Sequence, residues 1–152
     1  MAEFTVTRSV VVDAEANRCH ALVDDFHAWT AWSPWEDVDP ALERTYSGPD
    51  AGVGARYAWS GNRKAGRGSM EIVSSTPARI GVRLVFEKPW KATNAVEFRF
   101  TPTGSGTQVT WTMTGNNTGA AAVFARVVST DKLLGKDFDR GLARLRAVAE
   151  QP

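Results

Sequence analysis

The side chains best suited to proton transfer near neutral pH or to binding a soft metal are few in this chain of 152 residues: His20, His27 and Cys19. A metal site needs several ligands in a defined geometry. The sequence shows no such set, so we expect neither a metal nor another cofactor. His27, close to Trp29, is a candidate general base at a pocket edge, because imidazole has a pKa of about 6.5. The alternative place for His27 is the surface or a helix end.

Two other polar side chains could act inside a pocket. Glu36 follows Trp35, and its carboxyl would have a raised pKa in an apolar surrounding, whereas in solvent it would not. Asn94 shares strand parity with Val96 and Phe98, so we expect it to project inward. There it would orient a ligand carbonyl or hydroxyl, or bond a neighbouring backbone group. No serine, nor the cysteine, can be paired with a histidine to form an activated nucleophile.

The most informative feature is the number of tryptophans, which exceeds what the core of so small a chain needs. Each carries a large apolar surface and an indole N–H that requires a partner when buried. Several such rings around one space indicate a chemically selective apolar cavity. The six are Trp29, Trp32, Trp35, Trp59, Trp90 and Trp111.

Composition is that of one ordinary globular domain covering residues 1–152, with 43% hydrophobic and 23% charged residues. A net charge of +1 gives no argument for nucleic acid or an anionic membrane. We interpret the one basic cluster, residues 63–67, as a solvated hairpin tip; the alternative is a phosphate site. No stretch of about 18 apolar residues predicts a membrane span. With no secretory leader and a single cysteine, we expect a cytoplasmic protein.

Periodicity predicts a first strand, two short helices, six more strands and a long helix. The short helices span residues 14–23, with Asp13 as the cap, and residues 24–32. An apolar stripe indicates an amphipathic helix over residues 131–150, with Thr130 as its N-cap. Turn signals between the later strands predict an antiparallel meander. The strands are expected at residues 4–12, 42–47, 55–60, 66–75, 80–87, 93–101 and 108–114.

One face of the predicted sheet is apolar and the other charged, so the long helix should cover the apolar face. Gly68 of the sheet and Gly135 and Gly141 of the helix fall at inward positions. We expect them to leave space beneath the helix; the alternative is a fully packed core. The candidate ligand-binding residues are Trp32, Trp35, Tyr57, Trp59, Met70, Phe86, Asn94, Phe98, Trp111, Met113, Phe124 and Phe138.

Several local sequences are familiar, and together they span nearly the whole chain. They include residues 8–14 (RSVVVDA), 32–35 (WSPW), 57–62 (YAWSGN), 106–111 (GTQVTW) and 135–142 (GKDFDRGL). On these residues the chain resembles the SRPBCC superfamily of START-like, helix-grip proteins, which includes polyketide cyclase/dehydrase-like and lipid-transport domains. The resemblance implies an α+β fold in which a curved antiparallel sheet of about seven strands wraps around a long C-terminal helix.

Members of that superfamily bind lipids, polyketides or other apolar molecules, and some are enzymes. Our first hypothesis is therefore the binding of a small hydrophobic or aromatic ligand, lipid-like or polyketide-like, between the sheet and the C-terminal helix. One alternative is a cyclase/dehydratase-like enzyme. Another is a protein-interaction module, or a homodimer, that uses residues 120–128. In the first hypothesis those residues and the turn at residues 32–35 cover the cavity mouth.

Overall fold

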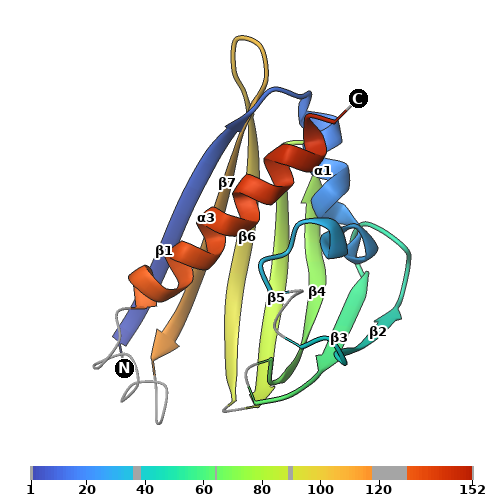
Figure 1. Cartoon of the computed structure of the whole chain (residues 1–152), viewed down its shortest axis with the longest axis vertical. Coiled ribbons are helices and arrows are strands. Elements are labelled where there is room, and N and C mark those ends of the chain that lie inside the picture. Colours follow the sequence, from blue (N-terminus) through green and yellow to red (C-terminus); the bar gives the residue numbers. More distant parts are fainter. Residues whose placement is uncertain (1, 36–38, 64, 89–90, 118–129, 152) are drawn as a thin grey trace.

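The computed structural model describes residues 2–35, 39–63, 65–88, 91–117 and 130–151. Seven strands form one antiparallel sheet in the order β1-β7-β6-β5-β4-β3-β2, and helices lie on one side of it (Figure 1). The α+β helix-grip fold predicted from the sequence is confirmed. The elements are β1 (Ala2–Val12), α1 (Ala16–Asp24), η1 (Phe26–Ala31), β2 (Glu43–Ser47), β3 (Arg56–Ser60), β4 (Arg67–Thr76), β5 (Arg79–Lys88), β6 (Ala92–Pro102), β7 (Thr107–Asn117) and α3 (Thr130–Ala149).

The C-terminal helix α3 crosses the sheet diagonally, from the lower ends of β1 and β7 to the region of α1 (Figure 1). Its buried stripe follows the predicted helical spacing, since Phe138, Leu142, Leu145 and Ala149 are each at most 2% exposed. The lower halves of β3, β4 and β5 extend beyond the ribbon of α3. The loop that follows η1 overlaps these halves in the same view. We call the part of the inner face that α3 itself does not cross the uncovered part.

The start of α1 differs from the sequence prediction. Asp13 does not cap this helix, which begins two residues later than expected, with Glu15 at the N-cap position. The backbone N–H of Asp13 instead donates to a carboxylate oxygen of Glu150, at 2.8 Å. No side chain caps α1 at Glu15, and the chain just before the helix is tied through Asp13 to Glu150, the residue after α3.

The short helix η1 is joined to α1 through two indoles. The last carbonyls of an α-helix lack partners within the helix. At the end of α1 the indole N–H of Trp29 donates to the carbonyl of Val23, and that of Trp32 to the carbonyl of Leu22, each at 2.8 Å. Each pair satisfies a buried donor and a free acceptor, so η1 is held against the inner face of the sheet.

Gly141 and Gly135 of α3 allow close packing. A Cβ on Gly141 would lie 2.8 Å from Cδ of Pro34 and 3.0 Å from Cζ3 of Trp111. At Gly135 the guanidinium of Arg8 occupies the position that a Cβ would take. The expectation that these two glycines leave space beneath the helix is wrong, because groups from the opposing layer fill that room.

Candidate functional site

The part of the inner face beneath α3 is a closed aromatic core. Four predicted site residues meet there, Trp32, Phe98, Trp111 and Phe138, and each is at most 1% exposed. Trp111 lies between Phe98 and Phe138, with ring centroids 4.9 Å and 4.0 Å away. Met113, at 2% exposure, is buried on the same face. These side chains are part of the hydrophobic core, and they present almost no surface to a ligand.

The uncovered part of the inner face carries the other predicted aromatic residues, and these are more accessible. Tyr57 is 8% exposed, whereas Trp59 and Phe86 are half-buried. The ring of Trp59 stacks on Tyr57 at 6.2 Å and meets Phe86 edge-on at 5.8 Å. Met70, opposite Tyr57 in the strand register, is 9% exposed. Together they form an apolar wall with two accessible rings.

Trp59 is held in this wall by its neighbours. Its indole N–H donates to the carbonyl of Ala65 at 2.9 Å. Its ring lies against Gly68, where a Cβ would come within 2.5 Å of Cη2 of Trp59. Gly68 therefore serves the close approach of an indole to the backbone of β4, and it does not leave empty space as we expected.

Asn94 lies on the same inner face, one strand beyond the wall. The strand register places Met70 opposite Leu84, and Leu84 opposite Asn94. Asn94 is 6% exposed, and its side chain makes no hydrogen bond within the described part of the chain. Gly115 on β7 provides its room, since a Cβ there would collide with Oδ1 of Asn94. Asn94 is thus a largely buried amide that makes no side-chain hydrogen bond to the described residues, while its polar atoms keep some contact with solvent.

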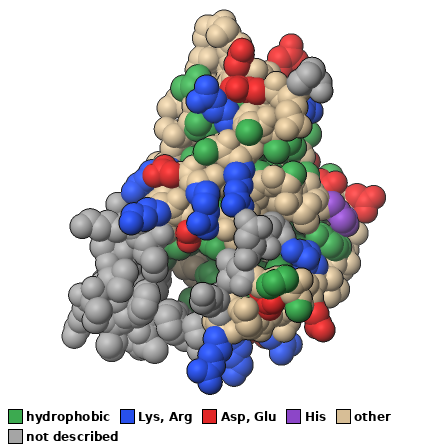
Figure 2. Space-filling view, viewed as in Figure 1, with side chains coloured by type: hydrophobic (Ala, Val, Ile, Leu, Met, Phe, Trp, Pro, Cys, Tyr) green, Lys and Arg blue, Asp and Glu red, His purple; other side chains and the backbone are tan. Residues whose placement is uncertain are grey.

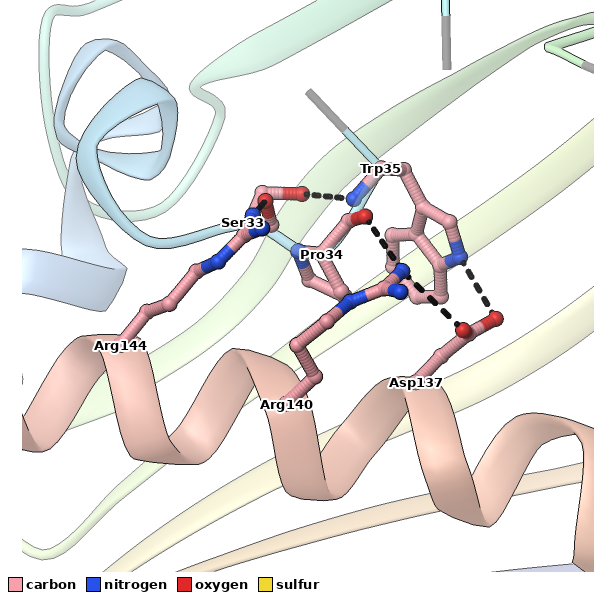
Figure 3. Close-up of polar contacts among 6 residues, drawn as sticks. All are labelled: Ser33, Pro34, Trp35, Asp137, Arg140 and Arg144. Atoms are coloured by element: carbon pink, nitrogen blue, oxygen red, sulfur yellow. Dashed lines mark hydrogen bonds and ion pairs between the residues drawn. The ribbon is translucent and has the colours of Figure 1, made fainter. Parts of the chain in front are cut away.

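The turn at residues 33–35 is fastened to α3 by charged side chains (Figure 3). Arg144 donates to the carbonyl of Ser33 at 3.1 Å, and Arg140 to the carbonyl of Pro34 at 2.9 Å. Asp137 accepts from the indole N–H of Trp35 at 3.2 Å. The turn thereby packs over the aromatic core; that it also covers the mouth of a cavity, as expected from the sequence, stays a prediction. No pattern in the sequence pointed to the three charged helix residues that hold it.

Residues 120–128 were expected to cover the cavity mouth together with this turn. They lie outside the described residues, as do Phe124, Glu36 and Trp90. Trp35 itself is half-buried and meets Trp111 edge-on at 5.6 Å. Its ring thus borders the core from the side of the turn.

The two histidines occupy different surroundings. Nδ1 of His27 lies 2.7 Å from a carboxylate oxygen of Asp25, and the ring stacks on Tyr46 at 3.9 Å. His27 and Tyr46 also line a shallow pocket of about 180 Å³ beside η1, together with Asp50 and Arg56. That pocket does not include Asn94 or the apolar wall. Sequence reasoning missed it, because the pairing of His27 with Tyr46 depends on how η1 meets β2.

His20 belongs to a short polar chain that joins α1 to β4. The hydroxyl of Ser75 donates to a carboxylate oxygen of Asp24 at 2.8 Å and lies 3.3 Å from Nε2 of His20. Because its proton is directed to the carboxylate, this hydroxyl is not arranged as a nucleophile activated by the imidazole. We interpret the three residues as a structural link.

Neither the cysteine nor an acidic cluster adds a reactive centre. Cys19 is fully buried, and this burial raises the pKa of its thiol above the ordinary value of 9.0, although a hydrogen bond with Thr107 acts in the opposite direction. Among the described residues, no group of three His, Cys, Asp or Glu side chains could hold a metal ion. No helix in the described part of the chain is long and apolar enough to cross a membrane.

Solved structures with the same arrangement share little sequence with this chain. A protein from Chromobacterium violaceum is 16% identical, with a TM-score of 0.70 over 97% of this chain and 98% of that one. A protein from Nitrosospira multiformis is 19% identical, with a TM-score of 0.68 over 97% of each chain. At these identities the likeness shows the fold.

A third structure is the di-domain ARO/CYC BexL from the BE-7585A biosynthetic pathway, 18% identical with a TM-score of 0.67. The match covers 99% of this chain and 51% of that one, so this chain corresponds to about half of BexL. No curated protein sequence matches significantly.

The family profile described as "Polyketide cyclase / dehydrase and lipid transport" matches residues 3–150. That range includes every local sequence on which the resemblance was based, and it takes in the sheet, the short helices and α3. The resemblance predicted from the sequence is confirmed, and this chain belongs to the polyketide cyclase/dehydrase and lipid transport family.

Proposed function

We propose that this protein binds a small aromatic or otherwise apolar molecule on the uncovered inner face of its sheet. The apolar part of the ligand would lie against Trp59 and Phe86, and the side chain of Asn94 would hydrogen-bond a polar group of the ligand. Binding pockets commonly combine such an apolar lining with a few placed polar groups.

Asn94 is the observation that carries this proposal. An amide buried without partners costs about 1–3 kcal/mol, so a purely structural position favours an apolar side chain. Here the chain places an amide at 6% exposure, provides room for it at Gly115, and gives it no hydrogen bond within the described residues. A ligand hydroxyl or carbonyl could reach this amide, whose polar atoms are not fully closed off from solvent, and would bond it in place of water.

The aromatic wall supports the same proposal. Trp59 and Phe86 keep accessible surface, while Trp111 and Phe138, which meet between the sheet and α3, keep almost none. Accessible rings held in fixed positions offer a large contact area at small entropic cost. Space is visible on the same side of the molecule, since Figure 2 shows a hollow beneath α3 with hydrophobic side chains inside it.

The test uses N-phenyl-1-naphthylamine, a neutral probe whose fluorescence rises in apolar surroundings. It should bind the protein, and 1-naphthol and 1-methylnaphthalene should displace it. These two competitors differ in a hydroxyl against a methyl group. In Asn94→Leu, 1-naphthol should compete about 2–10-fold less well, the value of one hydrogen bond, whereas 1-methylnaphthalene should compete equally or better.

Stability supplies the control. If Asn94 serves a ligand, Asn94→Leu should unfold at an equal or higher denaturant concentration, because an unpartnered amide is removed. Trp59→Leu should lower the affinity for the probe and for both competitors. The proposal would be contradicted if the probe did not bind. It would also be contradicted if Asn94→Leu lowered the affinities of 1-naphthol and 1-methylnaphthalene equally.

A cyclase/dehydratase-like reaction is the second candidate, favoured by the family and by the Asp25–His27 pair. A carboxylate on Nδ1 fixes the tautomer in which Nε2 is free to accept a proton. A catalysed reaction that is lost in His27→Ala, with probe binding retained, would establish it. The cytoplasmic location and the homodimer expected from the sequence stay predictions.

A further inference from the structure

Four basic side chains gather at the end of the sheet next to the aromatic wall. Arg63 lies in the turn between β3 and β4, Arg67 begins β4, and Lys88 ends β5. Lys91 precedes Ala92, which is opposite Phe86 in the strand register. All four are exposed, and Figure 2 shows Lys and Arg side chains at this lower end of the molecule. We call these four residues the basic rim.

The basic rim differs from the rest of the sheet surface in its pairing. On the outer face arginines lie beside glutamates: Glu71 lies 2.9 Å from Arg83 and 3.7 Å from Arg56, and Glu97 lies 3.6 Å from Arg79.

At the rim, Arg67 has one ion pair, with Glu87 at 3.3 Å. Arg63, Lys88 and Lys91 have none with the described residues. The surplus of positive charge is local, because the whole chain carries a net charge of only +1.

Two like charges of the rim are placed opposite each other at an irregularity in the register between β4 and β5. Arg67 and Lys88 are register partners on neighbouring antiparallel strands. Like charges placed directly opposite each other destabilise such a pair by a few tenths of a kcal/mol or more. Glu87, next to Lys88 at this bulge, pairs with Arg67, so one positive charge of the two is left without an acidic neighbour among the described ion pairs. An anionic group bound between them would remove the repulsion.

The rim is also close to the proposed binding surface. The indole N–H of Trp59 donates a hydrogen bond to the carbonyl of Ala65. Ala65 lies between Arg63 and Arg67 in the turn that joins β3 to β4. Lys88 follows Phe86 by two residues on β5. A ligand lying against Trp59 and Phe86 therefore ends at the rim. We infer that this ligand is an amphipathic anion, whose carboxylate, sulfonate or phosphate group lies at the basic rim while its apolar part lies on the wall. The inference rests on the proposed function.

Two matched probes test it. 8-Anilino-1-naphthalenesulfonate carries a sulfonate, and N-phenyl-1-naphthylamine has the same ring system without it. The sulfonate probe should bind more tightly at about 10 mM salt and lose that advantage at about 0.5 M, where the Debye length falls to about 4 Å. The neutral probe should change little with salt.

Single substitutions locate the effect. Lys88→Gln and Lys91→Gln should each weaken the sulfonate probe about 2-fold at low salt, as a unit charge about 8 Å away in water predicts, and about 4-fold together. Affinity for the neutral probe should not change. Arg146→Gln removes the same charge near the C-terminal end of α3, where Arg146 pairs with Glu150, and should leave both probes unchanged.

The outcomes separate this inference from the proposed function. If the neutral probe does not bind, the proposed function fails. If it binds, and the sulfonate probe shows neither salt dependence nor loss in the lysine variants, only the amphipathic anion is refuted. Co-sedimentation with vesicles of phosphatidylglycerol and phosphatidylcholine that is lost in the variants, without loss of the sulfonate probe, would instead make the rim a membrane-docking surface and overturn the inference.

Discussion

The indole of Trp111 lies flat on the phenyl ring of Phe138, with ring centroids 4.0 Å apart and ring planes 4° from parallel. Trp111 belongs to β7 and Phe138 to α3, so this stack joins the sheet to the helix. Both rings are at most 1% exposed. The contact therefore ties the sheet to the helix and leaves these two rings almost no accessible surface.

A double-mutant cycle should detect this stack. Trp111→Leu and Phe138→Leu should each destabilise the protein, and the double variant should lose less than the sum, by about 0.5–1.5 kcal/mol, because either single change already removes the aromatic contact. The indole N–H of Trp111 is buried without a partner in the described structure, so removing it offsets part of the cost of the first change. Urea unfolding measures all four proteins. Strict additivity would show that the rings only fill volume.

Two glycines of α3 should respond differently to alanine. Both changes gain about 1 kcal/mol of helix propensity. In Gly141→Ala that gain should be outweighed, because the new Cβ meets Pro34 at 2.8 Å and Trp111 at 3.0 Å. In Gly135→Ala the new Cβ meets only the end of the flexible Arg8 side chain, which can move aside.

We therefore expect Gly141→Ala to lower the melting temperature and Gly135→Ala to keep or raise it. Thermal unfolding followed by circular dichroism measures both. The reverse order would mean that the space beneath the helix lies at Gly141 after all.

Asp137 should hold Trp35 in place. Asp137→Ala removes the acceptor for the indole N–H of Trp35 and a partner of Arg140, so we expect a loss of about 0.5–1.5 kcal/mol. Hydrogen exchange at residues 33–35 should become faster. Asp139→Ala is the control, since its carboxylate is 61% exposed and its ion pair with Arg8 spans 3.6 Å. If residues 33–35 exchange at similar rates in both variants, Asp137 is not the residue that fixes the turn.

Glu150 should contribute to the acid sensitivity of the fold. The backbone N–H of Asp13, followed by Arg146, lowers the pKa of this carboxyl from its ordinary value of 4.5. A carboxyl with a depressed pKa in the folded state stabilises the protein above its unfolded pKa, and this stabilisation is lost as the pH falls through the folded pKa.

The difference in unfolding free energy between the natural protein and Glu150→Gln should thus be largest near pH 7 and shrink below pH 4.5. Chemical unfolding at several pH values measures it. A difference that stays constant down to pH 3 would show that the carboxylate charge is not involved.

The order of strands and helices could be predicted from the sequence because it depends on local chemistry. Alternation along the strands fixed which side chains face inward, so Trp59, Phe86 and Asn94 lie on the inner face as expected. The apolar stripe of α3 identified the face that it buries. These patterns repeat over many residues, and one conformation satisfies each of them.

Contacts between distant elements were decided by the tertiary structure. Inward parity is the same for Trp111 and Trp59, yet the path of α3 across the sheet closes off the first and leaves the second accessible. Likewise the glycines of α3 could open space or bring groups closer, and only the approach of Pro34 and Arg8 decides which. The sequence by itself determined which side chains face the interior; how deeply each is covered follows from packing between segments about a hundred residues apart, which no local pattern encodes.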